Sequence, residues 1–198
     1  MNIGCDLDGV IIDHSYNQAL MLAERGFIIP REKLSKQKLK TLLTPEQYSS
    51  FKKELYDIRS LSAQEITGAT DALRTITSLG HEIRIISRRD TSSAHALQWL
   101  DTHGILSIIP QSHIHFVQTY AQKEEVCRQY DIQIHIDDSP EVFELLRTPR
   151  HHILFDQFGH HQENKEKYKA VKEYFKHAQF ISVRSWRDIL NSLQHLDC

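Results

Sequence analysis

DLDGVII, at residues 6–12, is typical of a buried strand that ends and turns into a loop. Asp6 and Asp8 lie two residues apart, so in an extended backbone their side chains point the same way. Gly9 then allows a sharp turn. Such a pair can bind a cation, and one carboxylate can attack a phosphorus atom while the other transfers protons. Taken alone, the pattern is equally typical of a solvated Asp-rich turn.

The chain has 198 residues, a formal net charge of -2, and 40% hydrophobic and 25% charged residues. These values indicate an ordinary globular protein, not a nucleic-acid scaffold. No apolar run is long enough to span a bilayer, and Met1 leads directly into the first predicted strand, so we expect a cytoplasmic location. Three cysteines without CxxC spacing predict neither a disulfide framework nor a zinc site.

After residue 67 the pattern alternates between helices and strands. Strands are predicted at residues 83–87, 114–117, 132–136, 151–156 and 180–183, and helices at 69–79, 92–103, 121–130, 163–176, after Ser139 and from Ser185 onward. This alternation predicts an α/β fold with a Rossmann-like parallel sheet and helices on both faces. Residues 1–13 and 68–198 would form this core.

Residues 14–67 interrupt the alternation and predict a small, all-helical insert. Helices are predicted at 14–23, at Thr44-Pro45-Glu46-Gln47, where a capping box is complete, and at Ser62-Ala63-Gln64-Glu65. Between Arg31 and Arg59 the insert carries eight basic and four acidic residues. This positive charge is typical of a solvated helical face, and the alternative is a surface that attracts an anionic substrate.

Three predicted strands end in residues that suit phosphate chemistry. They are Asp6 with Asp8, Ser87 with Arg88, and Asp137 with Asp138. Lys123, at the start of a helix, can reach over the same edge, and ligands of parallel sheets bind beyond the carboxyl ends of the strands. Each residue alone could be a helix cap or a surface charge. Together they favour a catalytic site for phosphoryl transfer.

The chemistry assigns a role to each of these side chains. Asp6 would be the nucleophile and Asp8 the acid and base, while Ser87, Arg88 and Lys123 would bind the phosphate. Asp138 would complete an oxygen-rich site for Mg²⁺. His14, directly after the acidic loop, is either a substrate contact or simply the start of a helix.

The order of these motifs resembles that of the haloacid dehalogenase superfamily. The matching motifs are DLDGV, IIS, Lys123 and HIDDSPE. Asp8 makes the chain similar to the phosphatase branch, and an insert directly after the first motif resembles a C1 cap. More narrowly, the IDD-x-P motif, the HHILFD strand and the SWRDIL helix resemble the 5'(3')-deoxyribonucleotidases.

The resemblance implies that Asp6 is nucleophile and Mg²⁺ ligand, that Asp8 donates the proton and binds the metal through its carbonyl, and that Asp138 is the remaining protein ligand. It implies that Ser87 and Lys123 bind phosphate. Those nucleotidases stack the base on cap aromatics including tryptophan. Here the insert offers no tryptophan, only Phe27, Tyr48, Phe51 and Tyr56.

We therefore expect a Mg²⁺-dependent phosphomonoester hydrolase that acts through an aspartyl-phosphate on a small-molecule phosphate ester, with (deoxy)nucleoside monophosphates as the first candidates. Two alternatives stay open. One is a phosphatase of the same superfamily for another metabolite, such as a sugar phosphate, and the other is a phosphate-binding module without turnover. Neither a nucleic-acid polymer nor a membrane is expected as a partner, and the sequence indicates no oligomeric state.

Overall fold

The computed structural model describes residues 1–89, 93–161 and 179–196. Within these residues six strands form one sheet in the order β5-β4-β1-β6-β7-β8, and every neighbouring pair is parallel. The strands are β1 (Asn2–Cys5), β4 (Glu82–Arg88), β5 (Ile114–Val117), β6 (Ile134–Asp137), β7 (His151–Phe155) and β8 (Gln179–Val183). The predicted α/β fold is confirmed. The strand order reverses at β1, so a ligand site is expected beyond its carboxyl end.

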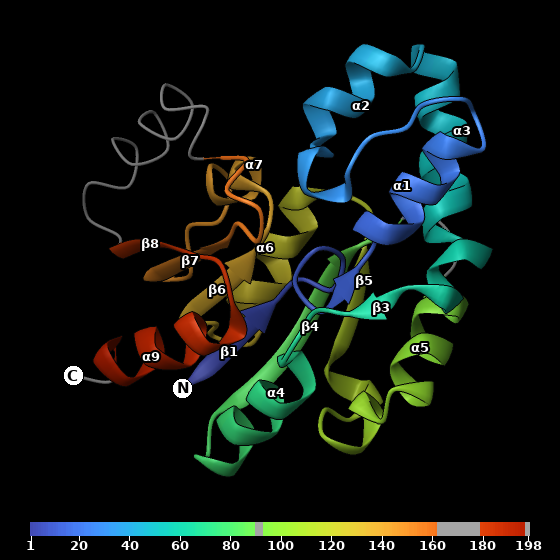
Figure 1. Ribbon diagram of the computed structural model, residues 1–198. Coiled ribbons are helices and arrows are strands. Elements are labelled where there is room, and N and C mark those ends of the chain that lie inside the picture. The colour runs from blue at the N-terminus through green and yellow to red at the C-terminus, as the bar shows by residue number, and fades with distance from the viewer. Residues whose placement is uncertain (90–92, 162–178, 197–198) are drawn as a thin grey trace.

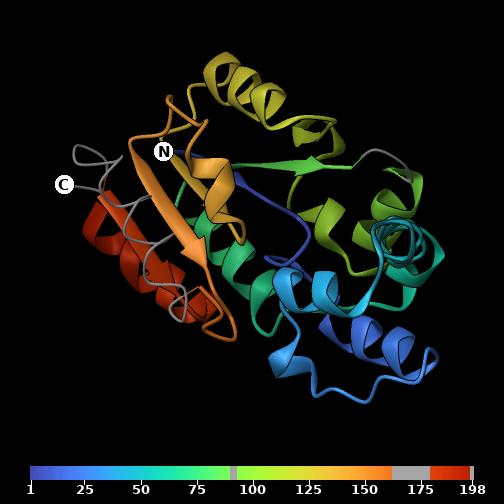
Figure 2. The same ribbon diagram turned by 90° about the horizontal axis from the view of Figure 1, so that it is seen from above.

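Helices cover both faces of this sheet (Figures 1 and 2). The helices α4 (Ala69–Ser78), α5 (Ser93–Thr102) and α9 (Trp186–Leu196) lie on one face, and α6 (Tyr120–Gln129) and α7 (Pro140–Phe143) lie on the other. Successive side chains of a strand point to opposite faces. Ile85 accordingly belongs to the same buried cluster as Trp99 and Trp186, while Ile86 belongs to the cluster of Phe143 on the second face.

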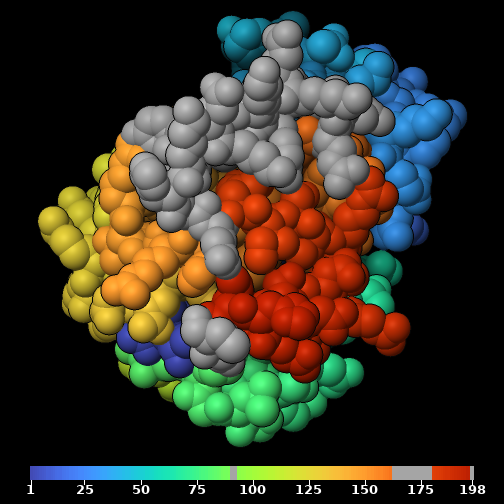
Figure 3. Space-filling model, turned by 90° about the vertical axis from the view of Figure 1, so that its left-hand side faces the viewer, coloured from blue at the N-terminus to red at the C-terminus, as the bar shows by residue number. Residues whose placement is uncertain are grey.

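The short 3₁₀ helices η3 (Ile105–Ser107) and η4 (Gln111–His113) connect α5 to β5. The C-terminal elements β7, β8 and α9 form one side of the molecule (Figure 3). Buried residues of α9 recur at helical spacing, at Trp186, Ile189 and Leu193, which attaches this helix to the sheet. No helix in the described parts of the chain is both long and apolar enough to cross a lipid bilayer. The predicted helix at 163–176 lies outside the described residues.

The region from residue 15 to residue 62, here called the helical region, lies beyond the carboxyl end of the sheet (Figure 1). It contains α1 (Ser15–Ala23), η1 (Arg31–Lys33), α2 (Lys36–Leu42), α3 (Pro45–Tyr56) and η2 (Ile58–Ser62). Met21, Leu39 and Phe51 belong to a separate hydrophobic cluster between these helices. The capping box at Thr44 and Gln47 is confirmed.

The helix predicted at residues 62–65 is wrong. Residues 58–62 form η2, and β3 (Gln64–Glu65) pairs antiparallel with β2 (Ile12–Asp13). The amide of Ile66 also donates to the carbonyl of Ile11, at 2.8 Å. These hydrogen bonds to a distant segment outweigh the local capping signal at Ser62. Both ends of the helical region are therefore tied together by one short sheet.

Candidate active site

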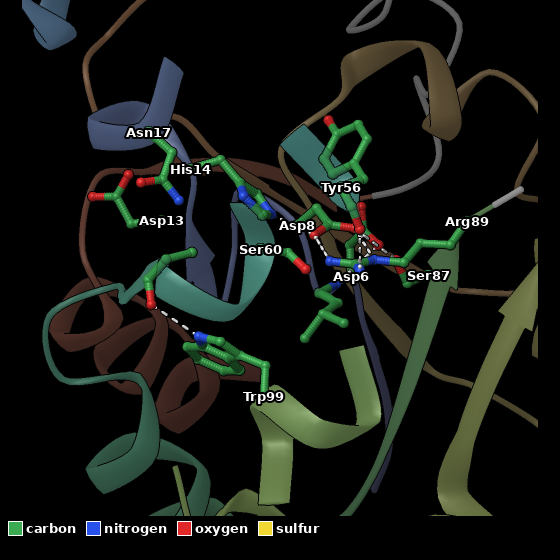
Figure 4. Close-up of polar contacts among 12 residues, drawn as sticks. Asp6, Asp8, Asp13, His14, Asn17, Tyr56, Ser60, Ser87, Arg89 and Trp99 are labelled. Atoms are coloured by element: carbon green, nitrogen blue, oxygen red, sulfur yellow. Dashed lines mark hydrogen bonds and ion pairs between the residues drawn. The ribbon is translucent and has the colours of Figure 1, made fainter. Parts of the chain in front are cut away.

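The acidic loop after β1 turns back immediately on itself. The amides of Ile11 and Ile12 both donate to the carbonyl of Leu7, at 2.9 Å. Gly9 sits at this turn with φ of 81°, a conformation that glycine adopts without strain. The turn leaves Asp6 and Asp8 at the end of the sheet, close to Ser87 and Arg89 (Figure 4). The amide of Asp6 donates to the carbonyl of Ile136 in β6, at 2.8 Å.

Lys123 lies at the centre of the site with 1% of its surface exposed. Its Nζ is 2.6 Å from Asp137 Oδ2 and 3.2 Å from Asp6 Oδ1. Burial lowers the pKa of Lys123, but the ion pairs with Asp137 and Asp6 outweigh it and hold the pKa above its ordinary value. The ammonium is therefore a permanent positive charge beside the predicted nucleophile.

Asp6 is buried among like charges. Its Oδ1 accepts from the amide of Leu7 at 2.9 Å and from Lys123. Burial raises the pKa of Asp6 to about 7; Lys123 opposes the rise, and Asp137 and Asp8 add to it. Both contacts use Oδ1, so Oδ2 is the oxygen that can attack a phosphorus atom.

Asp8 is held by three side chains (Figure 4). Arg89 donates from Nε to Oδ2 at 2.9 Å and from Nη2 to Oδ1 at 2.5 Å. His14 Nε2 lies 2.6 Å from Oδ1, and Ser87 Oγ lies 3.3 Å from Oδ2. Burial raises the pKa of Asp8, but Arg89 and His14 outweigh it and hold the pKa well below its ordinary value. The carboxylate is ionised here.

Asp6, Asp137 and Asp138 offer oxygens that lie within 4.8 Å of one another. Asp137 is already occupied, because Oδ2 meets Lys123 and His135 while Oδ1 accepts from the amide of Ser139. Among the described residues, the carboxylate of Asp138 takes part in no hydrogen bond or ion pair. Burial raises its pKa well above the ordinary value, and Asp137 and Asp6 add to the rise.

Gly9 makes room for this free carboxylate. A Cβ atom at Gly9 would lie 2.3 Å from Asp138 Oδ2, so a side chain here would displace it. Magnesium prefers carboxylate oxygens and tolerates little deviation from its coordination geometry. The carboxylates of Asp6 and Asp138 repel each other, and a cation bound between them would offset this repulsion. The pair therefore fits Mg²⁺.

A cleft of about 520 Å³ separates the sheet edge from the helical region. Besides the acidic residues, side chains from the helical region line it, among them Lys36, Lys52, Lys53, Tyr48 and Tyr56. Phe51 also lines the cleft but is fully buried in the cluster of the helical region. The cleft therefore carries positive charge and tyrosine rings opposite the carboxylates.

The structure places most of the predicted site residues together. Ser87 lies beside Asp8, and Lys123 lies beside Asp6. Arg88, however, is exposed on the cleft wall, with its guanidinium carbon 4.5 Å from the ring centroid of Tyr120. The buried arginine that reaches Asp8 is Arg89, which the sequence reasoning missed.

Two further contacts link Asp8 to the helical region. Arg89 also donates from Nη1 to the carbonyl of Tyr56 at 3.2 Å. The ring of His14, at the start of α1, meets Tyr56 edge-on with centroids 5.2 Å apart. The signal for His14 was its position directly after the acidic loop. For Arg89 the signal was its spacing from Ser87, because side chains two residues apart in an extended backbone point the same way.

Solved structures share the fold at low sequence identity. A haloacid dehalogenase-like protein from Agrobacterium tumefaciens has a TM-score of 0.65 at 16% identity, covering 98% of each chain. A family hydrolase from Deinococcus radiodurans, with bound phosphate and sodium, has a TM-score of 0.60 at 16% identity, covering 98% of this chain and 95% of that one. A predicted phosphoglycolate phosphatase from Haemophilus somnus has a TM-score of 0.59 at 13% identity, covering 97% of each chain.

No curated protein matches the chain. The family described as 5' nucleotidase, deoxy (pyrimidine), cytosolic type C matches residues 1–191, which is nearly the whole sequence. The resemblance to the deoxyribonucleotidases is thereby confirmed. With its parallel sheet and its cluster of strand-end carboxylates around one buried lysine, the chain belongs to this nucleotidase family and is a phosphatase of the haloacid dehalogenase type.

Proposed function

We propose that the protein is a Mg²⁺-dependent phosphomonoester hydrolase that forms an aspartyl-phosphate on Asp6. The observation that supports this proposal most is the arrangement around Lys123. Its ammonium touches Oδ1 of Asp6, a buried carboxylate that lines the cleft, and so places a fixed positive charge beside the oxygen that is proposed to attack. Positive charge placed where a phosphoryl group passes is the main means of accelerating such transfers.

In the first step Oδ2 of Asp6 forms a bond to phosphorus while the bond from phosphorus to the ester oxygen breaks. Lys123 and Ser87 hold non-bridging oxygens of the phosphoryl group. The leaving alkoxide takes a proton from Asp8. Arg89 keeps Asp8 ionised in this structure, so Asp8 must first take up the proton that it later donates. The monoanion of the phosphate ester can supply this proton as the phosphate enters and competes for the guanidinium of Arg89.

In the second step water attacks the phosphorus of the aspartyl-phosphate, Asp8 accepts the proton of that water, and the bond to Asp6 breaks to release inorganic phosphate. This proton returns Asp8 to the protonated form in which it entered the first step. Mg²⁺, held by Asp6, Asp138 and the carbonyl of Asp8, would supply Lewis-acid stabilisation of the phosphoryl charge.

For the substrate we propose a nucleoside monophosphate. The matching family is named for pyrimidine deoxynucleotides, and the cleft has room for more than a phosphate group. Tyr48 and Tyr56 offer rings on the wall formed by the helical region. In this proposal residues 14–67 act as the cap that selects the leaving group. A cytoplasmic location stays a prediction.

The test is a screen of phosphate monoesters, including ribo- and deoxynucleotides, glycerol phosphate and sugar phosphates, with Mg²⁺ and with EDTA. We expect hydrolysis with Mg²⁺ alone and a preference for nucleotides. Asp6→Asn should be inactive on every substrate because an amide oxygen is a poor nucleophile, whereas Asp71→Asn, on the exposed face of α4, should be fully active. Undiminished turnover in EDTA would refute the requirement for Mg²⁺. Hydrolysis of glycerol phosphate as fast as that of nucleotides would refute the assignment of a nucleotide substrate.

A further inference from the structure

His135 lies on β6 behind the active site and is fully buried. Its Nε2 is 3.2 Å from Asp137 Oδ2. An ionised carboxylate can only accept hydrogen bonds, so His135 donates from Nε2. Its other ring nitrogen, Nδ1, has no hydrogen-bond partner in the described parts of the chain. Within the described residues, the polar partner of the ring is therefore the carboxylate that holds Lys123.

The surrounding structure is shaped to hold this ring. Gly4 of β1 is the register partner of His135, and a Cβ atom at Gly4 would lie 2.6 Å from His135 Nδ1. Phe143 of α7 also meets the ring edge-on, with centroids 6.4 Å apart. A histidine placed against a glycine backbone and an aromatic ring has little freedom to turn away from Asp137.

The contacts continue from His135 to the nucleophile. Asp137 Oδ2 accepts from His135 and, at 2.6 Å, from Lys123, whose Nζ lies 3.2 Å from Asp6 Oδ1. A lysine side chain is long and flexible, and its ammonium has no preferred direction of its own. The position of Nζ therefore depends on where Asp137 is held, and the donors that hold Asp137 besides Lys123 are His135 and the amide of Ser139.

We propose that His135 is a positioning residue for phosphoryl transfer. It fixes the carboxylate of Asp137, which in turn holds the ammonium of Lys123 against Asp6 Oδ1 and the transferring phosphate. This inference rests on the proposed function for its effect on turnover. Its effect on geometry is independent of that function, because the contacts are present in the protein by itself.

The activity test uses p-nitrophenyl phosphate with three variants of His135. The amide nitrogen of glutamine can occupy the place of Nε2, whereas asparagine reaches only the place of Nδ1 and leucine offers no donor. We expect kcat to fall about tenfold in His135→Leu and His135→Asn and to stay within about threefold of wild type in His135→Gln, since partners of a site's direct ligands typically have effects of this size. The KM should change less than kcat.

His152→Leu is the matched control for loss of a buried histidine. His152 is the register partner of His135 on β7 and meets the same Phe143 ring, with centroids 5.1 Å apart. It should lose thermal stability as His135→Leu does but keep its kcat. The proposal is overturned if His135→Leu keeps wild-type kcat, if His135→Gln is no better than His135→Asn, or if His152→Leu loses as much kcat. Should the leucine variant not fold, the glutamine and asparagine pair decides.

A crystal structure of His135→Asn separates this proposal from the proposed function. We expect Asp137 to turn and Lys123 Nζ to leave hydrogen-bonding distance of Asp6 Oδ1. An unchanged arrangement would overturn the positioning role even if the enzyme is active. Absence of phosphatase activity in the wild type, together with a displaced Lys123 in the variant, would refute the proposed function and leave the positioning role supported.

Discussion

Replacing the predicted nucleophile, Asp6, by asparagine is expected to stabilise the metal-free protein at alkaline pH. Burial raises the pKa of Asp6 to about 7, against an ordinary value of 3.8. The folded protein thus binds a proton at Asp6 more tightly than the unfolded chain does. Between about pH 4 and pH 7 the folded state holds more protons, so this group makes the wild type lose stability as the pH rises.

The size of the effect follows from the same pKa. One pKa unit corresponds to about 1.4 kcal/mol, so a rise from 3.8 to about 7 removes about 4 kcal/mol of unfolding free energy by pH 8. Asparagine has nearly the same shape and carries no charge. The variant should exceed the wild type by about 2 to 4 kcal/mol at pH 8, and the difference should shrink towards zero near pH 4.

The assay is urea unfolding followed by circular dichroism, in EDTA, at several pH values from 4 to 8. Asp137→Asn is the matched control with the opposite sign. Burial raises the pKa of Asp137, but Lys123 outweighs it and holds the pKa below the ordinary value. That carboxylate stabilises the fold above its unfolded pKa, and the stabilisation disappears in acid. Asp137→Asn should therefore destabilise the protein at pH 8.

Two results would contradict this reasoning. One is an Asp6→Asn variant that is less stable than wild type at pH 8, which would mean that the ion pair with Lys123 outweighs burial and the repulsion from neighbouring carboxylates. The other is a difference between variant and wild type that is the same at every pH, which would mean that Asp6 has an ordinary pKa. Mg²⁺ should abolish the advantage of the variant, because a bound cation stabilises only the wild-type carboxylate.

Three further substitutions test other parts of the site. Lys123→Ala should lower kcat/KM at least tenfold, a loss of about 1.4 kcal/mol of transition-state stabilisation. Activity within about twofold of wild type would mean that Lys123 has only a structural role. Gly9→Ala should weaken Mg²⁺ binding measured by calorimetry, because its Cβ would lie 2.3 Å from Asp138 Oδ2. Gly26→Ala, with φ of 85° and open space around its Cβ position, should cost stability and leave Mg²⁺ affinity unchanged; equal losses of affinity would exclude the steric explanation. Arg89→Ala should cost about 3 kcal/mol of unfolding free energy, because it leaves the buried carboxylate of Asp8 without the guanidinium that pairs with it. The control Arg88→Ala, on the exposed cleft wall, should change stability by less than about 0.5 kcal/mol. Similar losses in the two variants would refute the role of the buried pair.

Features that depend on short-range patterns could be predicted from the sequence. Alternation of β-branched runs with helical periodicity requires a parallel sheet, and the carboxyl ends of parallel strands meet at one edge. That rule was enough to bring Asp6, Ser87 and Asp138 to the same place. The capping box at Thr44 was equally local, since its donors and acceptors lie three residues apart.

Features that depend on distant partners could be established from the folded structure alone. The strand at Gln64–Glu65 forms because Ile12 and Asp13 pair with it, although Ser62 signals a helix start. Arg89 is chosen over Arg88 because Asp8, 81 residues earlier in the chain, lies on its side of the strand end. The role proposed for His135 depends on Gly4, which leaves room for the ring, and on Asp137, which accepts its hydrogen bond. A local pattern specifies which backbone conformation is favourable, whereas the partner of a buried charge is set by the packing of whole elements.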